Sequence, residues 1–133
     1  MTTTRTEALY LTNATVLLVH QIDAAYWHEW RLFGLPGGIQ FFLVLNLPIV
    51  LMVLWGVSAV ARGKRAGVVF SWVLVASGLF AALFHGFHLW RGDDTFTNVT
   101  SKALLVATAA LSLAQAVDLL SGARAHPIFR KKE

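Results

Sequence analysis

Four long apolar segments dominate the sequence and constrain its fold more than any motif does. They span residues 8–27, 39–61, 67–90 and 103–120. Each is close to the roughly 20 residues that a helix needs to cross a hydrocarbon layer of about 30 Å. Hydrophobic residues make up 56% of the chain and charged residues 14%, against about 45–50% and about 25% in soluble domains. The sequence therefore predicts one all-α domain over residues 1–133, a bundle of four transmembrane helices.

The charges between the segments predict how the bundle is oriented. With four spans, both termini lie on the same side of the membrane. That side carries eight cations: Arg5, Arg62, Lys64, Arg65, Arg124, Arg130, Lys131 and Lys132. The other side carries three: Arg31, Arg91 and Lys102. Because the more cationic side of a membrane protein faces the cytoplasm, we expect both termini to be cytoplasmic.

Composition also excludes several kinds of chemistry. The chain has no cysteine, which excludes disulfides, thiolate metal ligands and thiol catalysis. Its net charge of +4 comes from short clusters between the apolar segments. These clusters form neither a basic face nor a nucleic-acid motif, so no nucleic-acid partner is expected. Membrane lipids are the expected surroundings instead.

Ionisable residues gather near the predicted outer ends of the first and third segments. They form a His20-x-x-Asp23 pair and a His85-x-x-His88 pair. Charged groups within a span are costly and mark functional sites. Spaced pairs on two facing helices are one way in which bundles build metal sites, and imidazole with carboxylate suits zinc or non-haem iron. We therefore predict a metal site made by these four residues, with His28 as a further candidate ligand.

The same pattern suggests a reaction. A divalent ion with an open position activates water or polarises a carbonyl or phosphoryl oxygen. Glu29 or Asp23, where it is not a ligand, is the predicted general base. Neighbours His28 and Glu29 cannot both face inward if the first helix continues through them. Near the membrane interface, such a site would meet amphiphiles. The prediction is a metal-dependent enzyme, a hydrolase or an oxidoreductase, that acts on a lipid or lipophilic small molecule.

Two other interpretations of these residues stay open. His20 with either His85 or His88 could ligate a haem iron axially, which would make the protein an electron carrier. Alternatively, the polar residues could form a proton or ion path, a small-ligand pocket or a structural subunit, with homo-oligomerisation for transport. A stripe of polar side chains supports either a path or an outer shell around a metal: Asn13, Ser71, Thr108, Ser112 and Gln115.

The segment "LLVHQIDAAYWHEWRLFGLPGG" resembles small bacterial integral-membrane proteins that are grouped as families of unknown function. His20, Asp23, Trp27, Glu29 and Trp30 and the Leu-Pro-Gly-Gly turn carry this resemblance. It implies a multi-pass protein of the bacterial cytoplasmic membrane and implies no activity. A looser likeness is to the HXXEE family of small membrane proteins, from which the chain departs because Gln-Ile-Asp follows His20 and no adjacent acidic pair is present.

Overall fold

The computed structural model describes residues 3–93, 95 and 97–125. This part of the chain contains four α-helices and one short 3₁₀ helix, and no strand. In chain order they are α1 (Thr3–Tyr26), η1 (Glu29–Arg31), α2 (Gly38–Ala61), α3 (Arg65–Trp90) and α4 (Val99–Ala125). The predicted all-α fold with four long helices is confirmed. Of the cations used to predict orientation, Arg130, Lys131 and Lys132 lie outside the described residues.

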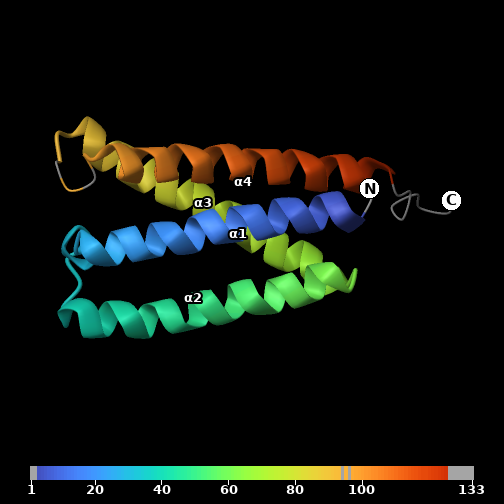
Figure 1. Cartoon of the computed structure of the whole chain (residues 1–133), viewed down its shortest axis with the longest axis horizontal. Helices are drawn as coiled ribbons and strands as arrows, with labels where there is room; N and C mark the ends of the chain where they lie inside the picture. The colour runs from blue at the N-terminus through green and yellow to red at the C-terminus, as the bar shows by residue number, and fades with distance from the viewer. Residues whose placement is uncertain (1–2, 94, 96, 126–133) are drawn as a thin grey trace, which may run out of the picture.

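The four helices run back and forth along the long axis of the molecule (Figure 1). The start of α1, the α2–α3 connection and the end of α4 lie together at what we call the terminal end. The α1–α2 and α3–α4 connections lie at the opposite end, which we call the loop end. Helix α1 contacts each of the other three helices. Its side chains therefore supply much of the interior of the bundle.

The long helices extend beyond the apolar segments that predicted them. Helix α1 begins at Thr3 and α4 ends at Ala125, whereas the apolar runs covered 8–27 and 103–120. Apolar length marks the part of a helix suited to hydrocarbon, while backbone hydrogen bonding continues through polar residues. At the start of α4, Oδ1 of Asn98 accepts a hydrogen bond from the backbone N–H of Ser101 at 2.8 Å. This side-chain cap explains why α4 begins before the apolar run.

The distribution of side chains is that of a membrane protein. Within the described residues, three helical segments are long and apolar enough to cross a membrane: Gly38–Ala61, Arg65–Trp90 and Val99–Gly122. Large apolar side chains such as Leu47, Trp55 and Leu83 point outward on these helices. Polar side chains are instead buried, among them Asn13, His20, Ser71, Ser112 and Gln115. An apolar exterior around polar groups is the pattern that a hydrocarbon solvent favours.

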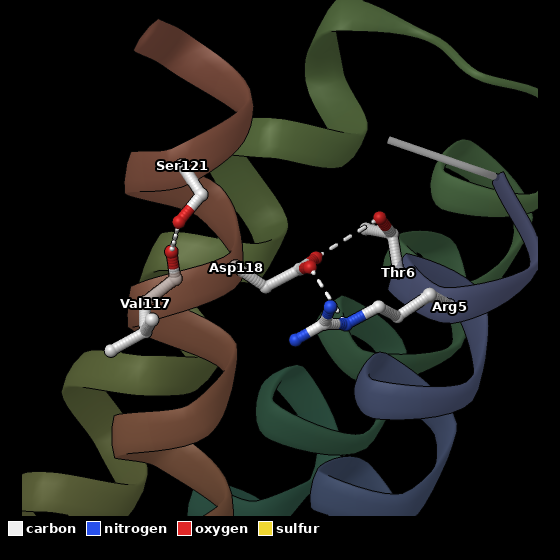
Figure 2. Close-up of polar contacts among 5 residues, drawn as sticks. All are labelled: Arg5, Thr6, Val117, Asp118 and Ser121. Atoms are coloured by element: carbon white, nitrogen blue, oxygen red, sulfur yellow. Dashed lines mark hydrogen bonds and ion pairs between the residues drawn. The ribbon is translucent and has the colours of Figure 1, made fainter. Parts of the chain in front are cut away.

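At the terminal end, a buried carboxylate fastens α4 to α1 (Figure 2). Asp118 is only 4% exposed. One of its oxygens lies 3.2 Å from Nε of Arg5, and the other accepts a hydrogen bond from the Thr6 hydroxyl at 3.1 Å. Both carboxylate oxygens therefore have partners from the first turn of α1. Sequence reasoning did not single out Asp118.

Further along the same interface, a second polar contact joins the two helices. The Asn13 amide donates to Oε1 of Gln115 at 2.8 Å and to the Ser112 hydroxyl at 3.2 Å. Gly78 of α3 packs against this layer, where a Cβ atom would collide with Oγ of Ser112. These contacts are of the kind by which polar and small residues hold membrane helices together.

Candidate metal centre

The chain turns sharply after α1, and this turn determines which side chains reach the interior. Helix α1 ends at Tyr26, and His28 adopts a left-handed conformation with φ 59° and ψ 44°. Histidine tolerates this region better than most residues with a Cβ. The 3₁₀ turn of η1 starts at the next residue, so the side chain of His28 is exposed while that of Glu29 is buried. A continuing helix would not have turned Glu29 inward.

Three side chains meet beneath this turn. His20 comes from α1, Glu29 from η1 and His85 from α3, and they are 0%, 6% and 1% exposed. Each offers one possible ligand atom, and these atoms all lie within 4.8 Å of one another. Nε2 of His85 lies 2.7 Å from Oε1 of Glu29. The rings of His20 and His85 pack edge to face, with centroids 5.0 Å apart. We call this group the His/Glu triad.

The spacing of the triad is close to that of a metal site. Zinc binds imidazole nitrogen and carboxylate oxygen at about 2.0–2.2 Å in tetrahedral geometry, so two ligand atoms on one ion lie about 3.4 Å apart. The three ligand atoms of the triad all lie within 4.8 Å of one another, so rotation of the side chains about their χ angles would bring them to this spacing. Two histidines and one glutamate match both the three-ligand set of catalytic zinc and the two-histidine, one-carboxylate set of non-haem iron.

The triad contains two of the four residues predicted as principal ligands. His20 and His85 are brought together, as the helical spacing indicated. Glu29, predicted as a general base, supplies the carboxylate in place of Asp23. Asp23 lies one turn beyond His20 in α1, and its Oδ1 accepts a hydrogen bond from the Trp27 indole at 3.2 Å. Its other oxygen, Oδ2, is buried and has no hydrogen-bond partner in the part of the chain that the structure describes.

The other two predicted ligands, His88 and His28, lie outside the triad. His88 is one turn beyond His85, and three residues of helix rotate a side chain about 60° away from the first. Its Nδ1 is 3.6 Å from an oxygen of Asp93, and both side chains are partly exposed. The left-handed turn directs His28 outward, where its ring packs on Trp30 with centroids 5.0 Å apart. The structure offers no common position for all five predicted ligands.

The predicted polar stripe does not surround the triad. Asn13 lies two turns of α1 away from His20, and its hydrogen bonds go to Ser112 and Gln115 of α4. Two turns of helix correspond to about 11 Å, which is too far for direct contact with a ligand side chain. These residues therefore hold α1 against α4. Helical periodicity predicted that these polar residues share a helix face. It did not predict at which level along the bundle axis each of them makes its contacts.

A cavity of about 490 Å³ opens beside the triad. His20 and Glu29 form part of its wall, and most of the remaining wall is apolar. The apolar lining comes from three helices and the segment after η1: Leu17, Phe33, Leu35, Phe42, Leu45, Ile49, Ala76, Phe80, Ala81 and Phe84. This volume lies in the range of about 300–1,000 Å³ that is typical of small-molecule sites. The arrangement places possible metal ligands at the edge of an apolar binding space.

Comparison with known proteins gives a family for the chain. The described residues form a small helical bundle of membrane character with a buried His/Glu triad. The chain belongs to the family of unknown function DUF6713, which matches residues 6–122. The matched segment includes the whole triad, and the predicted resemblance to a family of unknown function is confirmed. Neither the curated proteins nor the solved structures contain a match to this chain.

Proposed function

We propose that the protein binds one divalent metal ion through His20, Glu29 and His85 and uses it in chemistry on a lipophilic molecule. The observation that carries the proposal is the convergence of three metal-binding side chains from separate elements at one buried point. Buried ionisable groups are expensive in a membrane protein. A bound ion would compensate that cost, because it neutralises the carboxylate and bonds both imidazoles.

All four helices take part in the proposed membrane arrangement. Helix α1 has 24 residues, or about 36 Å at ~1.5 Å per residue, which is long enough to span. Its polar groups Asn13 and His20 are fully buried against the other helices. The cations of the first turn of α1 and of the α2–α3 junction belong to the terminal end: Arg5, Arg62, Lys64 and Arg65. The loop end carries Arg31, Arg91 and Lys102. This asymmetry supports the proposal that the termini are cytoplasmic and that the triad lies near the outer face of a bacterial cytoplasmic membrane.

The proposed chemistry uses the residues of the triad and its neighbour Asp23. Three protein ligands leave a divalent ion with an open position for water or substrate oxygen. A bound ion there would supply Lewis-acid activation if it is zinc, or oxidation chemistry if it is iron. Asp23 lies one turn of α1 from His20 and could act as a general base on a bound water, because its Oδ2 is buried and accepts no hydrogen bond from the described residues. The adjoining cavity supplies the space for an apolar substrate.

The geometry favours a single ion over haem. Haem with two axial histidines requires the macrocycle to lie between the two rings. The rings of His20 and His85 are only 5.0 Å apart between centroids and pack edge to face. A porphyrin cannot pass between rings at that separation without a large rearrangement of α1 against α3.

Metal analysis of the purified protein tests the proposal. The full chain is extracted in mild detergent without chelators, loaded separately with Zn²⁺ and Fe²⁺, and analysed by elemental mass spectrometry. We expect about one ion per chain in the wild type and a loss of most of it in His20→Ala and His85→Ala. His88→Ala and His28→Ala are matched controls that remove a histidine outside the triad, and both should keep the ion. A wild-type protein that retains neither metal would end this proposal.

A further inference from the structure

We infer that the cavity beside the triad binds an uncharged, single-chain amphiphile that enters from the membrane between α2 and α3. Its oxygen-bearing head group lies toward His20 and Glu29, and its chain extends toward the middle of the bundle. This inference names the substrate class of the proposed metal site and therefore rests in part on it.

The polarity of the cavity changes along its length. Three polar lining residues, His20, Gln21 and Glu29, lie near the loop end beside apolar residues such as Phe33 and Phe42, and Asn46 lies one turn of α2 further in than Phe42. The lining reaches inward as far as Ile49 on α2 and Ala76 on α3. These residues lie about 16 Å and about 21 Å from the loop ends of their helices, at ~1.5 Å per residue. Ser77 is the one polar residue of this inner part, and its hydroxyl already donates to the backbone oxygen of Val73 at 2.9 Å. A head group thus meets hydrogen-bonding side chains, whereas a chain meets apolar ones.

Asn46 provides a second polar contact for the head group. Its amide nitrogen donates to the backbone oxygen of Phe42 at 2.9 Å. Its Oδ1 is buried and accepts no hydrogen bond from any described residue. An unsatisfied buried acceptor costs free energy that a donor on a ligand would recover. A hydroxyl group is the simplest head group that donates to Asn46 while its oxygen faces the metal site.

The charges around the cavity favour an uncharged head group. Its lining contains no lysine or arginine. With a divalent ion bound, the carboxylates of Glu29 and Asp23 balance the charge of the ion. An anionic head group would add an uncompensated negative charge to this buried region, which is costly in a low-dielectric environment. A phosphate or carboxylate head group therefore fits less well than an alcohol.

The cavity opens toward the lipid-facing side of the bundle. Phe80 of α3 and Leu45 of α2 both line it, and they are 59% and 39% exposed. An opening between two helices of membrane-spanning length admits a chain directly from the bilayer. Nearer the loop end, the rings of Phe33 and Phe84 stack in parallel with centroids 4.2 Å apart. This stack forms part of the cavity wall at the loop end, whereas the exposed Phe80 and Leu45 mark the lipid side as the route of entry.

Photolabelling tests the inference in lipid nanodiscs. The probe is dodecanol with a diazirine at the end of its chain, and labelled peptides are mapped by mass spectrometry. We expect labels on α2 and α3 around Ile49 and Ala76, and competition by dodecanol about tenfold better than by dodecanoate or dodecyl phosphate. Ala76→Phe adds a phenyl group to the exposed wall of the inner part of the cavity, and we expect it to reduce labelling about tenfold. Ala66→Phe makes the same change at an exposed position of α3 outside the cavity and should label as the wild type does.

The outcomes separate this inference from the metal proposal. Labelling that is unchanged in Ala76→Phe, or competition by the anions equal to that by dodecanol, would overturn the inference. The metal content of Ala76→Phe is measured in parallel and should equal that of the wild type. If the wild type holds no metal but labels in the expected pattern, the cavity assignment stands and the metal proposal fails. If the wild type binds metal but the cavity residues are not labelled, the metal proposal stands and the cavity assignment fails.

Discussion

Glu29 and Asp118 are two buried carboxylates at opposite ends of the same bundle, with exposed fractions of 6% and 4%. Asp118 is paired with the Arg5 guanidinium and the Thr6 hydroxyl, so both of its oxygens are occupied. Arg5 itself is 69% exposed, which places the counter-charge in contact with solvent. Glu29 instead lies among the rings of His20 and His85, two side chains that bind metals or protons.

The difference indicates that burial alone does not separate the proposed ligand Glu29 from a structural carboxylate such as Asp118. The Arg5 guanidinium neutralises the charge of Asp118, and the Thr6 hydroxyl donates a hydrogen bond to it. Both contacts fix α1 to α4, which is a structural role. Imidazoles carry no fixed charge, so the partners of Glu29 compensate it fully only when they bind a proton or an ion. A buried carboxylate that pairs with a permanent cation is therefore expected to be structural, whereas one that pairs with imidazoles is a candidate metal ligand.

The largest expected effect is on metal affinity. Glu29→Gln keeps the size of the side chain but removes the charged ligand. Mutation of groups that only orient metal ligands weakens binding by about 10–100-fold, so loss of a ligand should weaken it by more than about 100-fold. Asp118→Asn is the matched change at the other end and should leave metal affinity unchanged. Competition titration with a chromogenic chelator measures both, and equal losses in the two variants would remove the contrast between the carboxylates.

The next effect is the response of stability to metal. An ion held at about 100 times its Kd stabilises the folded state by about 2.7 kcal/mol. We expect added zinc to raise the wild-type free energy of unfolding by about this amount in detergent, and to raise that of Asp118→Asn equally. Glu29→Gln should show almost no response. A response of wild-type size in Glu29→Gln would mean that zinc acts elsewhere on the protein.

A smaller loss of metal affinity is expected at Asp23. If this carboxylate acts beside the ion rather than as a ligand, Asp23→Asn should weaken metal binding by about 10–100-fold or less, so by less than Glu29→Gln does. Activity on any substrate should fall more than affinity does, because the variant cannot take up a proton. The same chelator titration ranks the two variants, and a larger loss in Asp23→Asn would make Asp23 the ligand, as the sequence first suggested.

The comparison also shows how far the sequence predicts this protein. The length of the apolar segments was sufficient to predict the four helices, because a run of about 20 apolar residues matches the thickness of the hydrocarbon layer and is rare in other structures. Helical periodicity was sufficient for His20 and His85, since each lies on a regular helix face. The role of Glu29 was not predictable in this way. It depends on the left-handed residue His28, and no glycine or asparagine marks that turn in the sequence.

Asp118 was missed for a different reason. The polar stripe on α4 was recognised through Thr108, Ser112 and Gln115, and Asp118 continues it by one further step of three residues. Extending the stripe would have found a buried carboxylate. Its partners Arg5 and Thr6 precede the first apolar segment, which was expected to begin at residue 8. The hydrogen bond from Thr6 exists because the helix continues past the apolar run.

The stability of the terminal end should change modestly when Asp118 is removed. Asp118→Ala leaves Arg5 free to reach solvent and Thr6 free to bond elsewhere, so the expected cost is about 1 kcal/mol in the free energy of unfolding. Arg5→Ala should cost at least as much, because it leaves the buried carboxylate of Asp118 with the Thr6 hydroxyl as its one remaining partner among the described residues. Unfolding by titration with a denaturing detergent measures both. A loss of metal content in Asp118→Ala would show that the two ends are coupled.

The smallest effect is expected at a third carboxylate, Asp93, which is partly exposed in the α3–α4 connection and pairs with His88. Hydrogen bonds from Thr95 hold the pKa of Asp93 below its ordinary value. A lowered pKa means that the contribution of Asp93 to stability is present above its ordinary pKa and is lost as the pH falls through the lowered value. The difference in free energy of unfolding between wild type and Asp93→Asn should therefore be constant near neutrality and shrink below about pH 4. Metal content should not differ between the two at neutral pH. A difference that grows as the pH falls would contradict the assignment, because it would require a pKa raised by folding.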